Sequence, residues 1–257
     1  MEFHSPKTQR IYSDRQVDTA WFVWINTHLA PQGKRVIDFG CGGGIYSEGF
    51  VIAGAKSVIG VDLSIQYVTA AKEEFVGYEN LRFQVGNAMS TGLESACADI
   101  VFERALIHHL TPDEQLKNAQ ECYRLLIVGG CLSVQDRTLE DVVDTNPDAW
   151  IRTTLIEAFP RLVDFERQRR PSRRDYEDIL INSGFNNIKT LTYAEIRKRY
   201  DAFDVLEQEI MSRKGKSTLF ELNDTELRQY CDLLSEKSQT RELIECDRWT
   251  VWLSEKV

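Results

Sequence analysis

A glycine-rich turn between two short apolar segments is the feature that most constrains the fold of this chain. Residues 36–44 read Val-Ile-Asp-Phe-Gly-Cys-Gly-Gly-Gly, and residues 58–64 read Val-Ile-Gly-Val-Asp-Leu-Ser. The first apolar run ends in Asp38 and the second in Asp62. Glycines let the backbone approach a ligand closely, and an acid after the second strand can accept hydrogen bonds from ribose hydroxyls. The pattern predicts a strand, a turn, a helix and a second strand that together bind a nucleoside-containing cofactor.

The spacing of the glycines distinguishes between cofactors. The dinucleotide fingerprint G-x-G-x-x-G/A needs a small third residue, because the helix packs closely on the strand there. Counted from Gly40, the third position is Ile45. The run is instead D-x-G-x-G-x-G, made by Asp38, Gly40, Gly42 and Gly44. It resembles the first motif of the class I S-adenosylmethionine-dependent methyltransferases, and an NAD-dependent oxidoreductase is the less favoured alternative.

The resemblance extends over residues 34–137. Residues 81–88 resemble the third strand of the family and its adenine-contacting turn, with Asn87 at a position where an acid is common. The amide of Asn87 can still accept a hydrogen bond from an adenine amino group. Residues 98–110 resemble the fourth strand and the loop that faces the methyl group, and residues 125–136 resemble the turn into the fifth strand.

The resemblance implies roles for individual residues. Asp38 would order the glycine turn and the amino-acid end of the cofactor, and Asp62 would bind both ribose hydroxyls. Leu63 would pack on the adenine. Arg15, near the N-terminal helix, could pair with the methionine carboxylate or be simply exposed. The other expected cofactor contacts are Gly40, Gly42, Gly44, Asn87, Ala88, Glu103 and Arg104.

Two adjacent histidines are the candidates for acid–base chemistry. Methyl transfer from a sulfonium depends mainly on proximity and alignment, with a base in some enzymes. His109 is the first choice for the base and His108 the second, because histidine titrates near neutral pH and can take a proton from a hydroxyl. The alternative is that both pack where the loop meets the helix at Thr111. Since no catalytic residue is compulsory, a non-catalytic S-adenosylmethionine-binding protein also stays open.

Composition narrows the class of partner. The net charge of −9 argues against a nucleic-acid substrate, and neither an Asn-Pro-Pro-Tyr nor a Pro-Cys motif follows the fourth strand. A small-molecule acceptor is therefore expected. The six cysteines form no C-x-x-C pair, so neither a metal site nor disulfides are expected. With no signal-peptide pattern and no apolar run near the ~20 residues of a membrane span, we expect a cytoplasmic protein.

Strands and helices alternate between residues 34 and 137, which predicts an α/β fold with a doubly wound, mostly parallel sheet. The ligand crevice of such a sheet lies at the carboxyl ends of its strands, where Asp38, Asp62, Asn87 and Glu103 are expected. The predicted strands are 34–39, 57–61, 81–85, 98–102, 131–136, 186–192 and 247–253. The predicted helices are 14–29, 44–53, 64–76, 112–125 and 174–183.

Three regions are expected. Residues 1–33 form an N-terminal helical cap, 34–137 form the cofactor-binding core, and 138–257 complete a seven-stranded sheet. Helical insertions at about 138–172 and 195–240 are candidates for a lid over the acceptor.

An arginine cluster lies in the first insertion. Arginine binds carboxylate and phosphate groups bidentately, so the cluster could hold an acidic group of the substrate. The alternative is that these arginines are solvated and paired with the neighbouring acids. Its members are Arg161, Arg167, Arg169, Arg170, Arg173 and Arg174.

Overall fold

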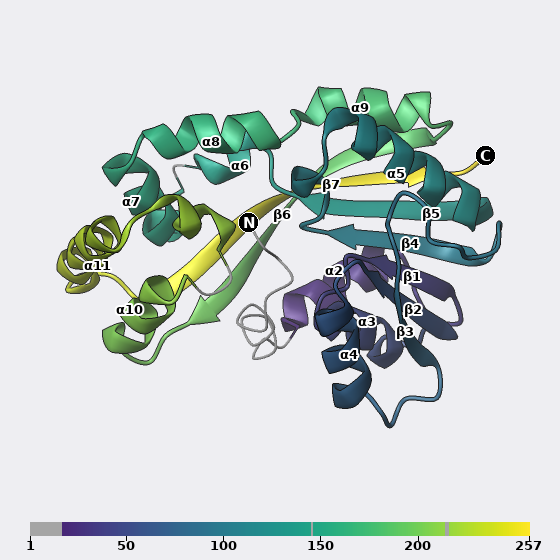
Figure 1. The fold of residues 1–257 in the computed structure, drawn as a ribbon, viewed down its shortest axis with the longest axis horizontal. Helices are drawn as coiled ribbons and strands as arrows, with labels where there is room; N and C mark the ends of the chain where they lie inside the picture. The colour runs from purple at the N-terminus through teal and green to yellow at the C-terminus, as the bar shows by residue number, and fades with distance from the viewer. Residues whose placement is uncertain (1–16, 145, 214–215) are drawn as a thin grey trace. The chain divides into compact units, whose positions relative to one another are not determined.

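The computed structural model describes residues 17–144, 146–213 and 216–257, which contain one seven-stranded sheet (Figure 1). The strands lie in the order β3-β2-β1-β4-β5-β7-β6. Strands β1 to β5 pair in parallel, whereas β7 is antiparallel to β5. The predicted doubly wound, mostly parallel sheet is confirmed. The strands are β1 Arg35–Phe39, β2 Ser57–Asp62, β3 Leu81–Val85, β4 Ala98–Arg104, β5 Leu126–Asp136, β6 Asn186–Arg199 and β7 Ile244–Glu255.

The chain divides into two compact units. The first comprises Met1–Asp136, Pro171–Thr192 and Thr250–Val257, and the second comprises Arg137–Arg170 and Tyr193–Trp249. Described helices of the first unit are α2 Thr19–His28, α3 Ile45–Ile52, α4 Ile65–Glu74, the 3-10 helix η1 Ile107–His109, α5 Pro112–Leu125 and α9 Arg173–Asn182. Described helices of the second unit are α6 Leu139–Val142, η2 Pro147–Ala149, α7 Trp150–Ala158, α8 Arg161–Arg169, α10 Phe203–Met211, η3 Ser217–Glu221 and α11 Asp224–Ser238.

Local sequence signals set the ends of several helices in the first unit. Helix α5 begins after Thr111, whose side chain accepts a hydrogen bond from the backbone of Glu114 while Glu114 bonds back to Thr111. Pro112 occupies the first helical position, where its missing N–H costs nothing. This reciprocal capping explains why the helix begins where the sequence predicts it.

The core of the first unit lies on both faces of the parallel strands. Val36, Ile37 and Phe39 of β1 are all buried, as expected for strands covered on both sides. The aromatic helix α2 packs on this core, with Trp21 fully buried and its ring centroid 5.1 Å from that of Phe50. The prediction of a core-packed N-terminal helix is therefore confirmed for its described part.

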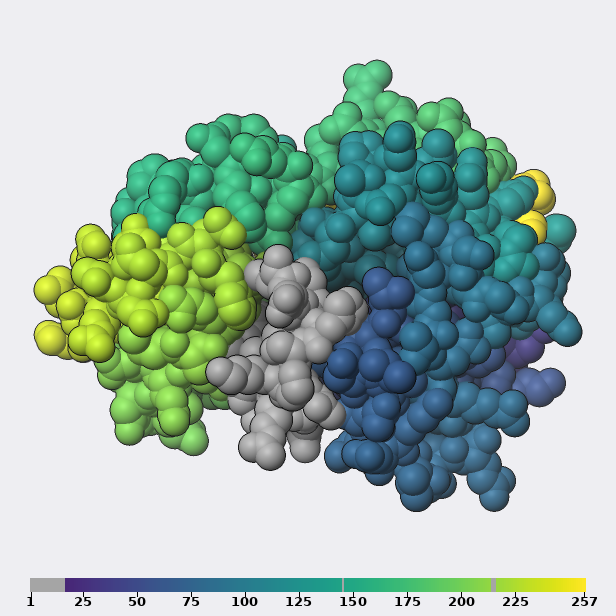
Figure 2. Space-filling view, viewed as in Figure 1, coloured from purple at the N-terminus to yellow at the C-terminus, as the bar shows by residue number. Residues whose placement is uncertain are grey.

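The second unit has an apolar core of its own. Leu155 of α7, Leu206 of α10 and Leu227 and Tyr230 of α11 are buried together. Helices α10 and α11 lie side by side, and both reach the surface in the yellow-green part of the space-filling view (Figure 2). The proposed lid role of the two insertions stays a prediction.

Strands β5, β6 and β7 extend furthest beyond their predicted bounds. Strand β5 begins at Leu126 rather than 131, and β7 extends from Ile244 to Glu255. Strand β6 continues to Arg199, so the prediction of helix from residue 195 onward is wrong for residues 195–199. These charged residues suit a helix by propensity, but pairing between β6 and β7 overrides that local preference. In the part of the chain that the structure describes, no helix combines the length and apolar character needed to cross a membrane.

Candidate cofactor and active site

The glycine turn joins β1 to α3 through three left-handed residues. Gly40, Gly42 and Gly44 have φ values of +64°, +51° and +86°, which favour glycine. A Cβ on Gly44 would lie 2.6 Å from Cζ of Phe83, so this position also has no room for a side chain. A Cβ on Gly42 would meet no atom of the described residues within 4 Å, so they leave the turn open on that side. The turn thus combines a packed side and an accessible side.

Asp62, at the end of β2, is hydrogen-bonded to the glycine turn. Its Oδ2 accepts from the backbone N–H of Gly42 at 2.9 Å, and its Oδ1 accepts from the N–H of Ser64 at 2.8 Å. Each carboxylate oxygen has a second lone pair for a ligand hydroxyl. The structure therefore brings Asp62 and the turn together, as the spacing predicts.

Asp38 is buried beneath the turn. Its Oδ2 accepts a hydrogen bond of 2.6 Å from the hydroxyl of Ser47 on α3. Burial raises the pKa of Asp38 to about 7; the Ser47 hydrogen bond opposes this rise, while the charges of Asp62 and Glu103 add to it. Asp38 ties strand to helix, which fits its predicted role of ordering the turn.

Two exposed apolar side chains follow Asp62 in the chain. Leu63 and Ile65, the latter the first residue of α4, are each 61% exposed. Asn87 Oδ1 accepts from the N–H of Met89 at 2.9 Å, and the carbonyl of Ala88 accepts from Asn118 at 3.3 Å. The sequence prediction included Leu63 but not Ile65. Ile65 lies two positions further along the chain, directly after Ser64, the N-cap of α4.

Glu103 does not lie where the sequence predicts it. We expected it after the end of a strand, but β4 continues to Arg104, and Glu103 is fully buried within it. Its Oε1 accepts hydrogen bonds from Asn118 at 2.7 Å and Cys122 at 3.1 Å on α5. Burial raises the pKa of Glu103 to about 7, although these two hydrogen bonds lower it. The strand is longer because pairing with β5 continues through Arg104 and Gln135.

Arg104 occupies the carboxyl end of β4. Its guanidinium donates a 2.6 Å hydrogen bond to Gln135 and lies 4.7 Å from the centroid of the Tyr46 ring, in the first turn of α3. Ala105, the next residue, has a φ of +54°, an unfavourable value for alanine. Strain of this kind is common at functional sites, and here it turns the chain toward the histidines.

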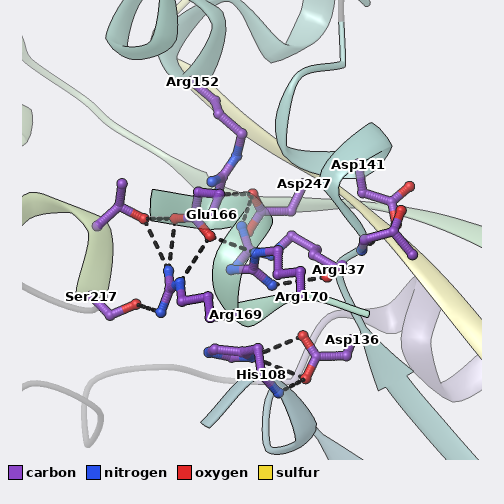
Figure 3. A network of polar contacts seen from close by, with 12 residues as sticks. His108, Asp136, Arg137, Asp141, Arg152, Glu166, Arg169, Arg170, Ser217 and Asp247 are labelled. Atoms are coloured by element: carbon purple, nitrogen blue, oxygen red, sulfur yellow. Dashed lines mark hydrogen bonds and ion pairs between the residues drawn. The ribbon is translucent and has the colours of Figure 1, made fainter. Parts of the chain in front are cut away.

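His108 and Asp136 form a buried pair at the ends of β4 and β5 (Figure 3). His108 Nδ1 lies 2.9 Å from each carboxylate oxygen of Asp136, and the backbone N–H of His108 donates to Asp136 at 3.3 Å. His109 is exposed, with its ring centroid 4.0 Å from that of His108. Asp136 was not predicted, although it ends a strand as Asp62 does.

The remaining predicted residues divide into two groups. Arg15 lies outside the described residues. The alternative interpretation is met in part, because Arg167 is exposed and paired with Asp164. Arg169 and Arg170 are paired with Glu166 but are largely buried rather than solvated, and Arg161 is paired with the distant Glu226.

Comparisons with known proteins identify the kind of domain. Residues 37–134 match the family model described as a methyltransferase domain. The ubiquinone biosynthesis O-methyltransferase of Pseudomonas putida is 26% identical over 187 residues, covering 69% of this chain and 76% of the relative. The protein of the same name from Pseudomonas entomophila is 27% identical with the same coverage.

Solved structures share the fold. A protein from Anabaena variabilis, assigned as a methyltransferase of an antibiotic biosynthesis pathway, has a TM-score of 0.69 at 19% identity and covers 95% of this chain and 98% of its own. Phosphoethanolamine N-methyltransferase 2 of Haemonchus contortus, in complex with S-adenosyl-L-methionine, has a TM-score of 0.61 at 18% identity and covers 97% of this chain and 56% of its own.

The fold and the glycine turn with its two acids define a class I methyltransferase. The chain is an S-adenosylmethionine-dependent methyltransferase, so its cofactor is S-adenosylmethionine rather than NAD. It is an enzyme, which sets aside the interpretation as a non-catalytic binding protein. The open side of Gly42, the Asp62 carboxylate and the exposed Leu63 and Ile65 fit the nucleoside part of this cofactor.

Proposed function

We propose that the enzyme methylates a hydroxyl oxygen of a small-molecule acceptor, with His108 as the general base. The pairing of His108 with Asp136 carries this proposal. A carboxylate at Nδ1 keeps the proton on that nitrogen and leaves Nε2 as the acceptor. It also stabilises the imidazolium that forms when Nε2 takes a proton. His109, the first choice from sequence, is exposed, whereas His108 is buried against Asp136.

A base is most useful for an oxygen acceptor. A phenol, with a pKa near 10, must lose its proton on methylation, whereas a neutral amine attacks through its lone pair. The names of the curated relatives, which are O-methyltransferases, support the same choice of atom. The net charge of −9 supports a small molecule rather than a nucleic acid as the acceptor.

The first unit supplies the residues that would hold the cofactor. Bound S-adenosylmethionine supplies a methyl group on a positively charged sulfur, which is a good leaving group. Asp62 would accept hydrogen bonds from the ribose hydroxyls, and Leu63 and Ile65 would cover the adenine. Asp38 would keep the turn in shape through Ser47. We further propose that the second unit selects the acceptor, as expected for a lid.

A paired acceptor screen tests the proposal. Phenols and catechols are incubated with the enzyme and S-adenosylmethionine beside matched anilines, and S-adenosylhomocysteine and methylated product are quantified by mass spectrometry. We expect methylation of hydroxyl acceptors, and a fall in kcat of about 100-fold in His108→Asn, the usual contribution of a general base. His109→Asn serves as the matched variant. Methylation of anilines alone, at rates independent of His108, would overturn the proposal.

A further inference from the structure

A short turn follows strand β3 and lies beside Asp62. Strand β3 pairs with β2 as far as Val85, which lies opposite Asp62. The backbone N–H of Gly86 then donates a hydrogen bond of 3.0 Å to the carbonyl oxygen of Asp62. The chain turns back through residues 87–90, which we call the β3 turn. Because Asp62 is the proposed partner of the ribose, the β3 turn borders the space for the base that the ribose carries.

The β3 turn presents the exposed amide of Asn87. The Oδ1 atom of Asn87 accepts a hydrogen bond of 2.9 Å from the backbone N–H of Met89, and this contact fixes which end of the amide is the oxygen. The second lone pair of that oxygen can accept a hydrogen bond from the exocyclic amino group of adenine. Hypoxanthine carries an oxygen at the same position, and two acceptors would then face each other. An amide held in this orientation therefore favours adenine.

Asn118, on helix α5, holds the peptide group that orients Asn87. Its Nδ2 donates to the carbonyl oxygen of Ala88 at 3.3 Å and to Oε1 of Glu103 at 2.7 Å. The Ala88 carbonyl belongs to the same peptide group as the N–H of Met89. Asn118 thus bonds to one end of this peptide group, while the other end bonds to Asn87.

The amide of Asn118 has one orientation that suits its surroundings. A carbonyl oxygen only accepts hydrogen bonds, so Nδ2 rather than Oδ1 must face Ala88. Asn118 is fully buried, and its Oδ1 has no hydrogen-bond partner among the described residues. Since an unpartnered buried oxygen costs free energy, the two donor contacts determine how this side chain lies. Glu103, buried in β4, therefore acts on the β3 turn through Asn118.

Helix α5 holds the chain after the β3 turn as well. The backbone N–H and the hydroxyl of Thr91 donate to Oε1 of Glu121 at 2.8 Å and 2.5 Å. Arg124 in turn donates to Glu121 at 2.7 Å. This second attachment fixes the exit of the turn, whereas Asn118 fixes a peptide group inside it.

We propose that Asn118 is a positioning residue for recognition of the base, because it holds the Ala88–Met89 peptide group that orients Asn87. The inference rests on the proposed place of the nucleoside beside Asp62, and not on which atom of the acceptor is methylated. Without the amide of Asn118 this peptide group can rotate, and Asn87 can then turn its nitrogen toward a base oxygen. Loss of Asn118 should therefore reduce discrimination between bases, and not only affinity.

Titration calorimetry with S-adenosylhomocysteine and with S-inosylhomocysteine, its hypoxanthine analogue, tests this inference. The wild-type enzyme should bind the adenine ligand about 10-fold or more tightly than the hypoxanthine ligand. In Asn118→Leu, a substitution of similar size, that ratio should fall to about 3-fold or less.

Gln115→Leu is the matched control, because Gln115 is another buried amide of the same helix. Its Nε2 donates to the carbonyl oxygens of Ile107 and Leu110 rather than to the β3 turn. The ratio of the two affinities should stay at its wild-type value in this variant. An equal fall in both variants would overturn the inference, because the effect would not then be specific to the contact with Ala88.

Circular dichroism checks the fold of each variant. If Asn118→Leu does not fold, Asn118→Ala takes its place, because the smaller side chain leaves room for a water that can bond to the Ala88 carbonyl. A folded variant that weakens both ligands by the same factor, or neither, would show that Asn118 has only a structural role. Equal binding of the two ligands by the wild type would also overturn the inference, since the β3 turn would not then recognise the base. The assay measures binding without turnover, so these results are independent of whether the enzyme methylates hydroxyl groups.

Discussion

The carboxylate of Asp62 accepts a hydrogen bond from the backbone N–H of Gly42, 2.9 Å away across the glycine turn. The acid at the end of β2 and the turn after β1 are therefore held together by the chain itself. A carboxylate that is already in place loses little conformational freedom when a ribose hydroxyl binds to it. This preorganisation is the physical reason why the two motifs occur together.

Asp62→Ala should weaken binding of S-adenosylhomocysteine about 100-fold without unfolding the chain. The substitution removes hydrogen bonds to a charged group, each worth about 1.5–3 kcal/mol. Asp62 is only partly buried, so loss of its contacts to Gly42 and Ser64 should leave the fold intact. Titration calorimetry gives the affinity and circular dichroism checks the fold. Glu73→Ala, an exposed acid on α4, controls for the charge change, and an unchanged affinity in Asp62→Ala would refute the assignment.

Replacement by alanine should destabilise the fold at Gly44 but not at the adjacent Gly43. Gly44→Ala forces a Cβ to within 2.6 Å of Phe83 at a φ of +86°, so a loss of about 3 kcal/mol in the free energy of unfolding is expected. The added Cβ of Gly43→Ala meets no atom within 4 Å in the described part of the chain, so this variant should change the free energy of unfolding by less than about 0.5 kcal/mol. Urea unfolding of both variants measures this. Equal losses of unfolding free energy in the two variants would show that packing against Phe83 does not exclude a side chain at position 44.

The parts of the site that could be predicted from sequence are those set by local chain geometry. Gly40, Gly42 and Gly44 need left-handed backbone, and Asp62 follows a buried strand, so residue type and spacing suffice for both. Thr111 caps α5 for similarly local reasons. Such signals depend on a few neighbouring residues, so they can be recognised in one amino-acid sequence.

What could not be predicted depends on pairing between distant segments. Whether Glu103 ends β4 or lies within it is decided by β5, which pairs as far as Arg104 and Gln135. The proposal of His108 rather than His109 rests on Asp136, 28 positions further along the chain. Ile65 carries no signal in the sequence that separates it from a buried helix residue. These features can be determined only from the tertiary structure.

Asp136→Asn should lower kcat with little change in KM for S-adenosylmethionine. In the proposed mechanism Asp136 is a positioning residue, because it contacts His108. An asparagine removes the negative charge that stabilises an imidazolium, so the acid limb of the pH–rate profile should move to lower pH. Kinetics from pH 5 to 9 measure both effects. A uniform loss of activity with an unmoved profile would indicate a purely structural role.

The buried carboxyl of Glu103 should make the stability of the enzyme depend on pH. Its pKa in the folded chain is about 7, above its ordinary value of 4.5, because burial disfavours the charged form. The folded state therefore holds a proton that the unfolded state releases between these values. The stabilising contribution is complete below pH 4.5 and is lost as the pH rises through 7.

Glu103→Gln should remove this dependence, because an amide resembles the protonated carboxyl and does not ionise. At pH 5 the variant and the wild type should have similar free energies of unfolding. By pH 8 the variant should be more stable by about 1–3 kcal/mol, the range expected for a shift of this size in a buried group. Urea unfolding at pH 5, 6, 7 and 8 gives the curve, with the surface variant Glu73→Gln matching the charge change. A stability difference that stays constant across these pH values would mean that Glu103 is ionised in the folded enzyme throughout, and that its contacts with Asn118 and Cys122 outweigh the cost of burial.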